Sequence, residues 1–399
     1  MLFHFLRSMG TFCLLWYGIA AFAQPFSPGT SYFGNEQYIE YLAGNMPIIL
    51  SAPHGGLLNP SSLPDRSCSG CSTVNDFNTQ ELARALASSI HEQTGCWPHL
   101  VINRLHRRKL DANRDLEEAA DGHPVAGQAW ADFHAFLGIA KEQVSNQFGK
   151  GLYIDLHGHG HAVQRLELGY LLYEEELRLP DDTLNQSNYI GYSSIQHLVG
   201  NNLQGLSHAE LLRGNQSMGT LLANRGYPAT PSLSDPAPAL GQAYFSGGYN
   251  TATYSSYQGG VIDGFQLECN RTGIRDSITQ VQRFADTLAV SILDYLGRHY
   301  FSESMSSYCN SSVATEFTPE DLWSIQPNPF CEELTLKTDV IGKEWELEGY
   351  SFTGQLLFQQ SLGETNLIRL SSSILPGGWL VLRCKGEIRS VKTVIQKCE

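Results

Sequence analysis

Basic residues are scarce in this chain, and so is charge of either sign. Lys and Arg number 26 against 40 Asp and Glu, which gives a formal net charge of −14, and charged residues make up 17% of the 399 positions. A general nucleic-acid binder needs a basic face to neutralise phosphates, and tight adsorption to anionic lipid needs the same. We therefore expect no nucleic-acid partner. Since 42% of the residues are hydrophobic, the composition of a disordered protein is absent too.

Long hydrophobic runs are also missing. After the N-terminal region no segment reaches the roughly 18 uncharged apolar residues of a membrane span, so no transmembrane segment is expected there. At the N-terminus, Arg7 precedes an apolar run from Thr11 to Ala23, which ends in an A-x-A cleavage site. A spanning helix needs about 20 apolar residues, so this run is too short for an anchor. Residues 1–23 are interpreted as the signal peptide of an exported protein.

Cysteines number nine, and Cys13 lies within the predicted signal peptide, which leaves eight. An even number in an exported chain is typical of disulfide pairing. Cys68 and Cys71 form a C-x-x-C motif, but a zinc ribbon would need a second such pair, and the sequence has none. A disulfide that closes this short loop is therefore favoured over a metal site. The other pairings stay open.

Strand-like and helix-like segments alternate from Met46 to Tyr300. Apolar runs predict strands, and apolar residues at three- and four-residue spacing predict helices. Strands are expected at residues 46–51, 100–102, 152–156, 166–173 and 265–268, and helices at residues 80–92, 129–148 and 278–296. This alternation is typical of an α/β domain in which helices flank a mixed or largely parallel β-sheet. We assign it to residues 24–301.

The composition changes after this domain. Residues 302–323 are rich in Ser and poor in large apolar groups, as expected of a linker. In residues 324–399, short alternating segments are separated by Gly and Pro, which predicts a small C-terminal β-sandwich.

The predicted sandwich carries several short motifs. Pro327-Asn328-Pro329-Phe330 stands at its start, Gly354 follows a strand, Pro376-Gly377-Gly378 precedes one, and residues 391–395 form a terminal strand. Together they resemble the type A C-terminal sorting domain of type IX secretion. The resemblance implies recognition by the type IX secretion machinery, and a secreted or cell-surface protein that crosses the periplasm of a Gram-negative bacterium. A carbohydrate-binding or adhesive sandwich is the alternative.

Histidines gather where the predicted strands end. His54 follows the first strand, and His157, His159 and His161 follow the third. In an open α/β sheet the carboxyl ends of neighbouring strands meet in one crevice. Two histidines from different strand ends are therefore candidate ligands of one metal ion, because imidazole with a carboxylate and an open position is the donor set of catalytic zinc. The alternative for a single histidine is an ordinary core residue.

Two acids are candidates to complete such a site. Asp76 lies just before the helix expected at residue 80, where it would either cap the helix or bind the metal; Asn78 and Thr79 are better placed to cap. Glu268 ends a predicted strand, where it would either pair with an arginine or take a proton from water as a general base.

Residues 107–115 contain the only dense basic run of the sequence. A solvated surface is the default interpretation of such a run. Here Asp111 and Asp115 alternate with the bases, so we expect salt bridges to hold Arg114 in place. A guanidinium group held in this way can bind a substrate carboxylate through two hydrogen bonds, with Asn113 beside it as an amide donor.

Taken in order, these motifs resemble the N-formylglutamate amidohydrolase family, which is related to the zinc carboxypeptidases. The resemblance covers most of residues 46–296 and rests on Pro53-His54-Gly55-Gly56, Asp76, Asp111-Ala112-Asn113-Arg114-Asp115, Asp155-Leu156-His157-Gly158, Gly169-Tyr170, Tyr244-Phe245, Gly247-Gly248-Tyr249-Asn250, and Gln266 with Glu268. It implies an α/β fold with a mixed sheet between helices, and a Zn²⁺ cofactor.

The resemblance also implies roles for single residues. His54 and His157 match the metal histidines and Asp76 the acidic ligand, Glu268 matches the general base, and Asn113 with Arg114 matches the carboxylate-binding pair. Zinc carboxypeptidases have His-x-x-Glu at the first motif, whereas here Leu57 stands three residues after His54.

Three residues remain as candidate substrate contacts. His159 and His161 are candidate oxyanion donors or substrate-binding residues, and Tyr249 is a candidate pocket residue. For all three, a place in an ordinary, flexible surface loop is the alternative.

The leading prediction is a secreted zinc-dependent amidohydrolase that cleaves an amide bond of a carboxylate-bearing N-acyl amino acid or peptide. An exported metallopeptidase or cell-wall amidase is the alternative among enzymes, because the family's named substrate belongs to a usually cytoplasmic pathway. A non-catalytic metal- or glycan-binding surface protein is the alternative from a different class.

Overall fold

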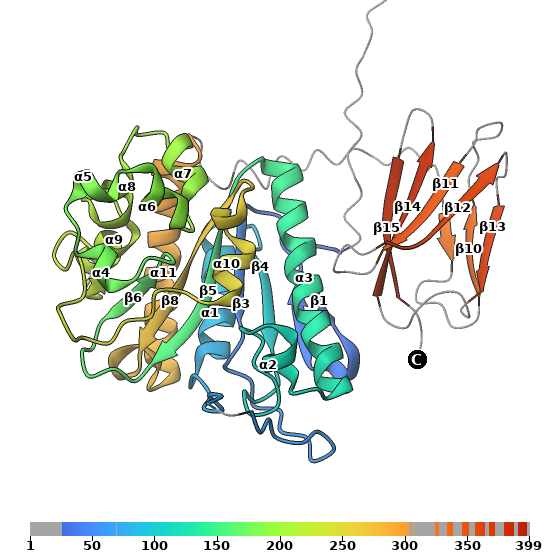
Figure 1. Cartoon of the computed structure of the whole chain (residues 1–399), viewed down its shortest axis with the longest axis horizontal. Helices are drawn as coiled ribbons and strands as arrows, with labels where there is room; N and C mark the ends of the chain where they lie inside the picture. Colours follow the sequence, from blue (N-terminus) through green and yellow to red (C-terminus); the bar gives the residue numbers. More distant parts are fainter. Residues whose placement is uncertain are drawn as a thin grey trace, which may run out of the picture.

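The structure, a computed structural model, describes residues 26–68, 70–302 and 306, together with the backbone of seven strands between residues 324 and 396. Its centre is an eight-stranded sheet in the order β1-β2-β4-β3-β5-β8-β6-β7 (Figure 1). The strands are β1 Ser31–Phe33, β2 Ile39–Leu42, β3 Ile48–Ala52, β4 His99–Asn103, β5 Gly151–His159, β6 Leu166–Gly169, β7 Ala229–Thr230 and β8 Ile262–Asn270.

The sheet is mixed, as the sequence predicts. Strands β4, β3, β5 and β8 run parallel at its centre, whereas β2 pairs antiparallel with β4 and β6 pairs antiparallel with β8. The helices around it are α1 Thr79–Thr94, α2 Leu116–Ala120, α3 Pro124–Phe148, α4 Glu174–Leu177, α5 Asp181–Leu184, α6 Ser187–Tyr192, α7 Gln196–Asn201, α8 His208–Arg213, α9 Met218–Asn224, α10 Tyr249–Tyr254 and α11 Ile278–His299.

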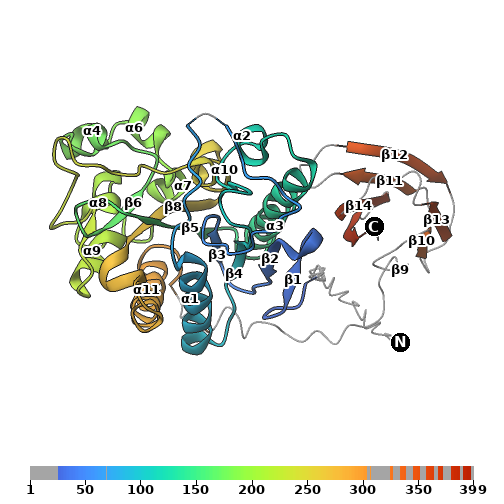
Figure 2. The same ribbon diagram turned by 90° about the horizontal axis from the view of Figure 1, so that it is seen from below.

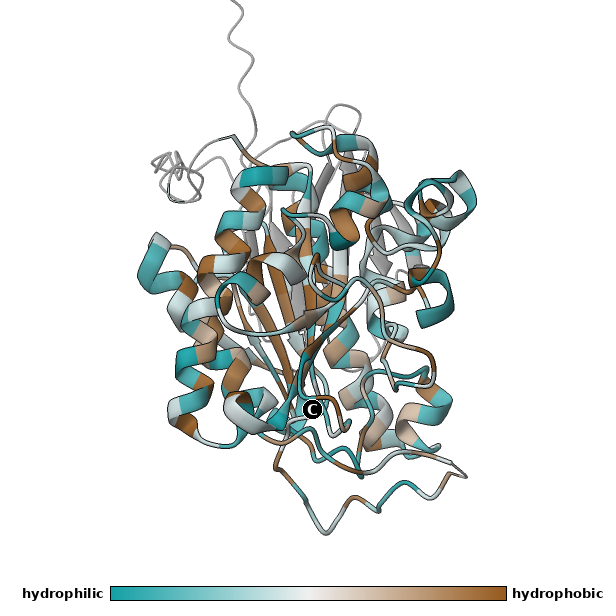
Figure 3. Ribbon diagram, turned by 90° about the vertical axis from the view of Figure 1, so that its left-hand side faces the viewer, coloured by the Kyte–Doolittle hydropathy of each residue, from teal (hydrophilic) through white to brown (hydrophobic). Residues whose placement is uncertain are grey.

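Helices cover both faces of the sheet. Helices α1 and α11 pack together on one face, and α3 lies with α10 on the other (Figure 2). Because successive side chains of a strand point to opposite faces, each central strand contributes to two apolar cores. Leu50 and Ile154 belong to the core under α1 and α11, whereas their neighbours Ile49 and Tyr153 belong to the core under α3. Figure 3 shows apolar strands enclosed by helices whose outer faces are polar.

The long helices begin and end where the sequence indicates. Helix α11 buries the predicted apolar stripe, and the Ser277 hydroxyl accepts a hydrogen bond from the Gln280 amide at its start. Helix α1 ends at Gly95, whose positive φ of 76° suits a residue without a side chain. Every strand and helix predicted between residues 46 and 300 is present, with bounds that shift by a few residues.

The predicted strand at residues 166–173 is too long. Strand β6 stops at Gly169, because the chain turns at Leu171, which has a φ of +66°. Strands β1 and β2 and the short helices from α4 to α9 were not predicted, since they are too brief to show a period in the sequence. The predicted Cys68–Cys71 disulfide is present, and Cys269 is a buried free thiol.

The C-terminal strands form two sheets, in the orders β13-β10-β9 and β12-β11-β14-β15. They are β9 Ser324–Gln326, β10 Glu333–Lys337, β11 Trp345–Tyr350, β12 Leu356–Gly363, β13 Leu367–Ser371, β14 Trp379–Gly386 and β15 Ser390–Gln396. The predicted signal peptide and nearly all of the predicted linker lie outside the described residues. Among the described residues, no helix combines the length and the apolar character that a membrane span requires.

Candidate metal and catalytic site

Two of the predicted ligands lie at the carboxyl ends of neighbouring parallel strands. His54 follows β3 by two residues, and His157 lies near the end of β5. Both side chains are buried, and their Nδ1 atoms face each other at 3.1 Å. The convergence expected from the strand ends is therefore present.

Asp76 reaches the same point from the loop between β3 and α1. Its Oδ2 lies 3.4 Å from Nδ1 of His54 and 3.3 Å from Nδ1 of His157, and it accepts a hydrogen bond from the Gly158 amide. Burial opposes ionisation of this carboxyl group, but the two neighbouring histidines hold the pKa of Asp76 well below its usual range. His54, Asp76 and His157 thus form one group with the spacing of metal ligands.

The outer nitrogens of the two histidines are held by further carboxylates. Nε2 of His54 lies 2.6 Å from Oδ1 of Asp111, and Nε2 of His157 lies 2.8 Å from Oδ2 of Asp155. A carboxylate that accepts the outer N–H fixes the tautomer, so the lone pair of the imidazole lies on Nδ1. Two Nδ1 lone pairs and a carboxylate oxygen aimed at one point repel one another unless a cation lies between them. The residues present therefore fit a divalent metal ion, and this donor set suits zinc.

Without a metal ion, protonation has to supply the positive charge. Burial lowers the pKa of His157, but the charge and hydrogen bond of Asp155, with Asp76 and Glu268, raise it overall to about 10. The carboxylate neighbours of His157 thus favour its protonated form. The surroundings are therefore arranged for positive charge, which agrees with a cation site.

Glu268 lies beside this group on the next strand. In the parallel pair β5–β8 it stands opposite His157, and its Oε1 is 4.0 Å from His157 Nδ1. Oε1 accepts a hydrogen bond of 2.8 Å from the Gln266 amide, whereas Oε2 is buried without a hydrogen-bond partner among the described residues. Burial raises the pKa of Glu268 to about 8, with the charge of His157 opposing and that of Asp76 adding. This is the chemistry expected of a group that exchanges protons.

The candidate substrate contacts Asn113, Arg114 and Tyr249 lie together. The Asn113 amide approaches His157 Nε2 at 3.4 Å, and its Oδ1 accepts the amide of Asn250. A side chain at Gly248 would overlap Asn113, so glycine permits this approach. The indole of Trp130 donates to the Arg114 carbonyl and lies 6.5 Å from the ring of Tyr249. Substrate binding by these residues stays a prediction.

Arg114 does not pair with Asp111 or Asp115, contrary to what the sequence predicts. Its guanidinium pairs with Glu118 at 2.9 Å, because Asp115 caps α2 and Asp111 is turned toward His54. Asp111 instead accepts a hydrogen bond from Arg107, whose guanidinium also lies 3.6 Å from Asp76. Arg107 thus contacts the metal group directly, which its place in the basic run does not indicate.

His159 and His161 follow His157 but do not join its group. His159 is buried, and its Nε2 donates to the carbonyl oxygen of Arg165 at 2.8 Å. His161 lies 2.9 Å from Glu167, which the sequence analysis did not name. The side chain of His161 is 19% exposed; with Glu167 the two histidines form a second group that has the spacing of metal ligands.

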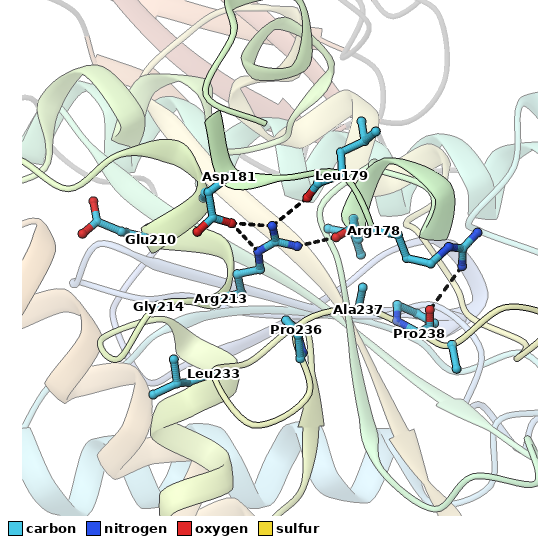
Figure 4. A pocket seen from close by; sticks show the side chains of 13 residues that line it. Arg178, Leu179, Asp181, Glu210, Arg213, Gly214, Leu233, Pro236, Ala237 and Pro238 are labelled. Atoms are coloured by element: carbon cyan, nitrogen blue, oxygen red, sulfur yellow. Dashed lines mark hydrogen bonds and ion pairs between the residues drawn. The ribbon is translucent and has the colours of Figure 1, made fainter. Parts of the chain in front are cut away.

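A surface pocket of about 720 Å³ lies elsewhere, between α4, α5, α8 and the segment 233–239 (Figure 4). None of the predicted site residues lines it. Its Arg213 pairs with Asp181 and with backbone carbonyls, and Arg178 donates to Pro238. Since its charged side chains already have partners, the strand ends and not this pocket are the candidate site.

Comparison with known proteins finds matches among the solved structures. No protein-family model matches the chain, and no curated protein matches it. A crystal structure of N-formylglutamate amidohydrolase from Ralstonia eutropha JMP134 is similar with a TM-score of 0.39 and 15% sequence identity, over 68% of this chain and 99% of that one. A likeness at this level says nothing about activity, so the geometry of the site has to carry the functional assignment.

Proposed function

We propose that this protein is a zinc-dependent hydrolase that cleaves an amide bond of a carboxylate-bearing N-acyl amino acid or peptide. One observation carries the proposal. Two imidazole nitrogens and a buried carboxylate converge on one point, and a second carboxylate with an unpartnered oxygen lies beside them. Two histidines and one acid are the ligands with which zinc hydrolases leave a position open for the reaction.

The metal ion and Glu268 have separate roles in the proposed reaction. When bound by His54, Asp76 and His157, zinc supplies a Lewis acid that polarises a carbonyl group and acidifies water. Glu268 accepts a proton from the attacking water, whose oxygen bonds to the carbonyl carbon, and returns that proton to the amide nitrogen as the C–N bond breaks. Proton transfer of this kind contributes about 10²–10⁴-fold to the rate.

Recognition of the substrate carboxylate falls to Arg114 in this proposal. Its side chain is 37% exposed, so the guanidinium can exchange Glu118 for a substrate carboxylate. Asn113 links it to the metal group, since its amide lies next to His157. Tyr249 completes the cluster through its contact with Trp130.

A paired measurement of turnover and zinc content tests the proposal. The wild type is assayed with N-formylglutamate, N-acetylated amino acids and short peptides, next to Glu268→Gln and the control Glu175→Gln, which changes an exposed glutamate of α4. We expect Glu268→Gln to keep its zinc and to lose at least about 10²-fold in turnover. The control should match the wild type.

The possible results separate the alternatives. Full turnover by a zinc-loaded Glu268→Gln enzyme would show that the general-base assignment is wrong. Higher activity on oligopeptides than on N-acyl amino acids would indicate a metallopeptidase or cell-wall amidase. If the zinc-loaded wild type turns over none of the substrates, the enzyme assignment is wrong and a metal- or glycan-binding protein is favoured.

Export belongs to the same proposal and is supported by the sequence alone. Residues 1–23 have the pattern of a signal peptide, and the C-terminal motifs resemble a type IX sorting domain. N-terminal sequencing of the protein from the medium or the cell surface should begin at Gln24. Recovery of the chain from the cytoplasm with its first residues intact would contradict export.

A further inference from the structure

A second group of potential ligands stands beside the first. His159, His161 and Glu167 bring two imidazole nitrogens and a carboxylate oxygen within 4.8 Å of one another. Glu167 is fully buried and His159 is 4% exposed, while the His161 side chain is 19% exposed. The donor set, two histidines and one carboxylate, is the same as that of His54, His157 and Asp76.

Hydrogen bonds hold the members of the second group in place. Nε2 of His159 donates to the carbonyl oxygen of Arg165, which leaves the lone pair on Nδ1; the one partner of that atom is the backbone amide of His161 at 3.1 Å. Glu167 presents Oε1 to His161 at 2.9 Å, and the Phe245 amide holds its Oε2 at 2.9 Å. Outer partners such as those of His159 Nε2 and Glu167 Oε2 are typical of metal sites.

The two groups flank Glu268 in the sheet. Strand β8 lies between β5 and β6, and Glu268 stands opposite His157 on one side and opposite Glu167 on the other. Residues that are opposite each other on adjacent strands have side chains on the same face, about 4.5–5.5 Å apart at Cβ. One oxygen of Glu268 is buried without a hydrogen-bond partner among the described residues. The buried carboxylates of Glu167 and Glu268 repel each other, and a nearby positive charge would stabilise both.

We infer that His159, His161 and Glu167 bind a second divalent cation, for which zinc is the best match to the donor set. Glu268 then lies between two cation sites. An ordinary His161–Glu167 ion pair would account for one contact, but it does not account for the buried imidazole of His159, which lies within 4.8 Å of both. The inference concerns binding alone and holds whether or not the protein is a hydrolase.

The test is a count of zinc ions per chain. The full chain, purified without a histidine tag and stripped of metal, is dialysed against increasing zinc and analysed by elemental mass spectrometry. The variants are His161→Ala, His157→Ala and the two combined. His197→Ala is a matched control, because His197 has the same 19% side-chain exposure and also faces a buried acid, Asp263, at 3.4 Å.

We expect two zinc ions in the wild type and in His197→Ala, one in each single variant, and none in the double variant. Circular dichroism establishes that each variant is folded, and the wild-type count does not depend on any substitution. A wild type that saturates at one zinc, kept by His161→Ala and lost by His157→Ala, overturns the second site and leaves the first intact. A double variant that still binds one zinc ion would also contradict the second site, because each proposed site has then lost a histidine.

Discussion

The guanidinium group of Arg275 lies against the backbone of Gly158, so closely that a Cβ at this position would overlap it. Arg275 is buried and donates to the carbonyl oxygens of Cys269, His159 and Phe77. These carbonyls belong to the end of β8, the end of β5 and the loop that carries Asp76. One buried cation therefore ties together three segments that supply the metal group.

This contact predicts that Gly158→Ala damages both stability and metal binding. The added methyl group has to displace Arg275 or the backbone of β5, and overpacking of this kind costs about 1–3 kcal/mol of unfolding free energy. The Gly158 amide also donates to Asp76, so the ligand should shift and zinc should bind more weakly. Urea denaturation of the metal-free protein and a zinc competition titration measure the two effects.

Gly138→Ala is the matched control for this substitution. Gly138 lies within α3, and a Cβ there meets no atom within 4 Å. Because Ala is the better helix former, this variant should be about 0.5–1 kcal/mol more stable than the wild type, with unchanged zinc affinity. Equal stability of the two alanine variants would contradict the role of Arg275.

Asp111→Asn should weaken the first zinc site without removing a ligand. The amide oxygen can still accept the Nε2–H of His54, but the negative charge that makes Nδ1 a better donor is gone. Loss of such an outer partner typically lowers metal affinity about 10–100-fold. Isothermal titration with zinc measures the change, and Asp182→Asn on the exposed start of α5 serves as control. An affinity that is the same in both variants would show that the charge of Asp111 does not affect zinc binding by His54.

Much of the site could be predicted because it follows from strand order. His54, His157 and Glu268 come at the ends of apolar runs, and parallel strands bring their ends together in any α/β sheet. Asp76 could be predicted because Asn78, two residues later, takes the N-cap position of α1, although its side chain makes no capping hydrogen bond. Each of these predictions used only local pattern and one topological rule.

The outer partners could not be predicted in the same way. Asp111 stands in a basic run, and nothing in the sequence tells which cation a carboxylate will face; in the structure it turns to His54, and Glu118 takes its place at Arg114. Glu167 lies next to Glu268 because β6 pairs antiparallel with β8, and no local sequence pattern indicates this pairing. The unpredicted residues are thus those whose partners are set by the tertiary fold.

Removal of metal should lower the thermal stability of the folded domain. A ligand that binds only the native state adds about 2.7 kcal/mol when its concentration is 100 times its dissociation constant. For a domain of this size that corresponds to a loss of roughly 5–10 °C in the unfolding midpoint on chelation. Differential scanning calorimetry with and without EDTA measures it. The variant that combines His157→Ala with His161→Ala should be indifferent to the chelator, and an equal shift in that variant would mean that the effect is not due to these sites.

Arg114→Ala should affect binding of the substrate carboxylate more than the chemical step. Charge-assisted hydrogen bonds contribute about 1.5–3 kcal/mol, so kcat/KM should fall about 10- to 100-fold, mainly through KM. Arg298→Ala is the matched control, since Arg298 is 42% exposed and pairs with Asp294 four residues away, as Arg114 is 37% exposed and pairs with Glu118. The control should leave kinetics unchanged. If instead Arg114→Ala lowers kcat at unchanged KM, the residue acts on the reaction and not on recognition; if Arg107→Ala alone raises KM, the carboxylate is bound by the arginine nearer to Asp76.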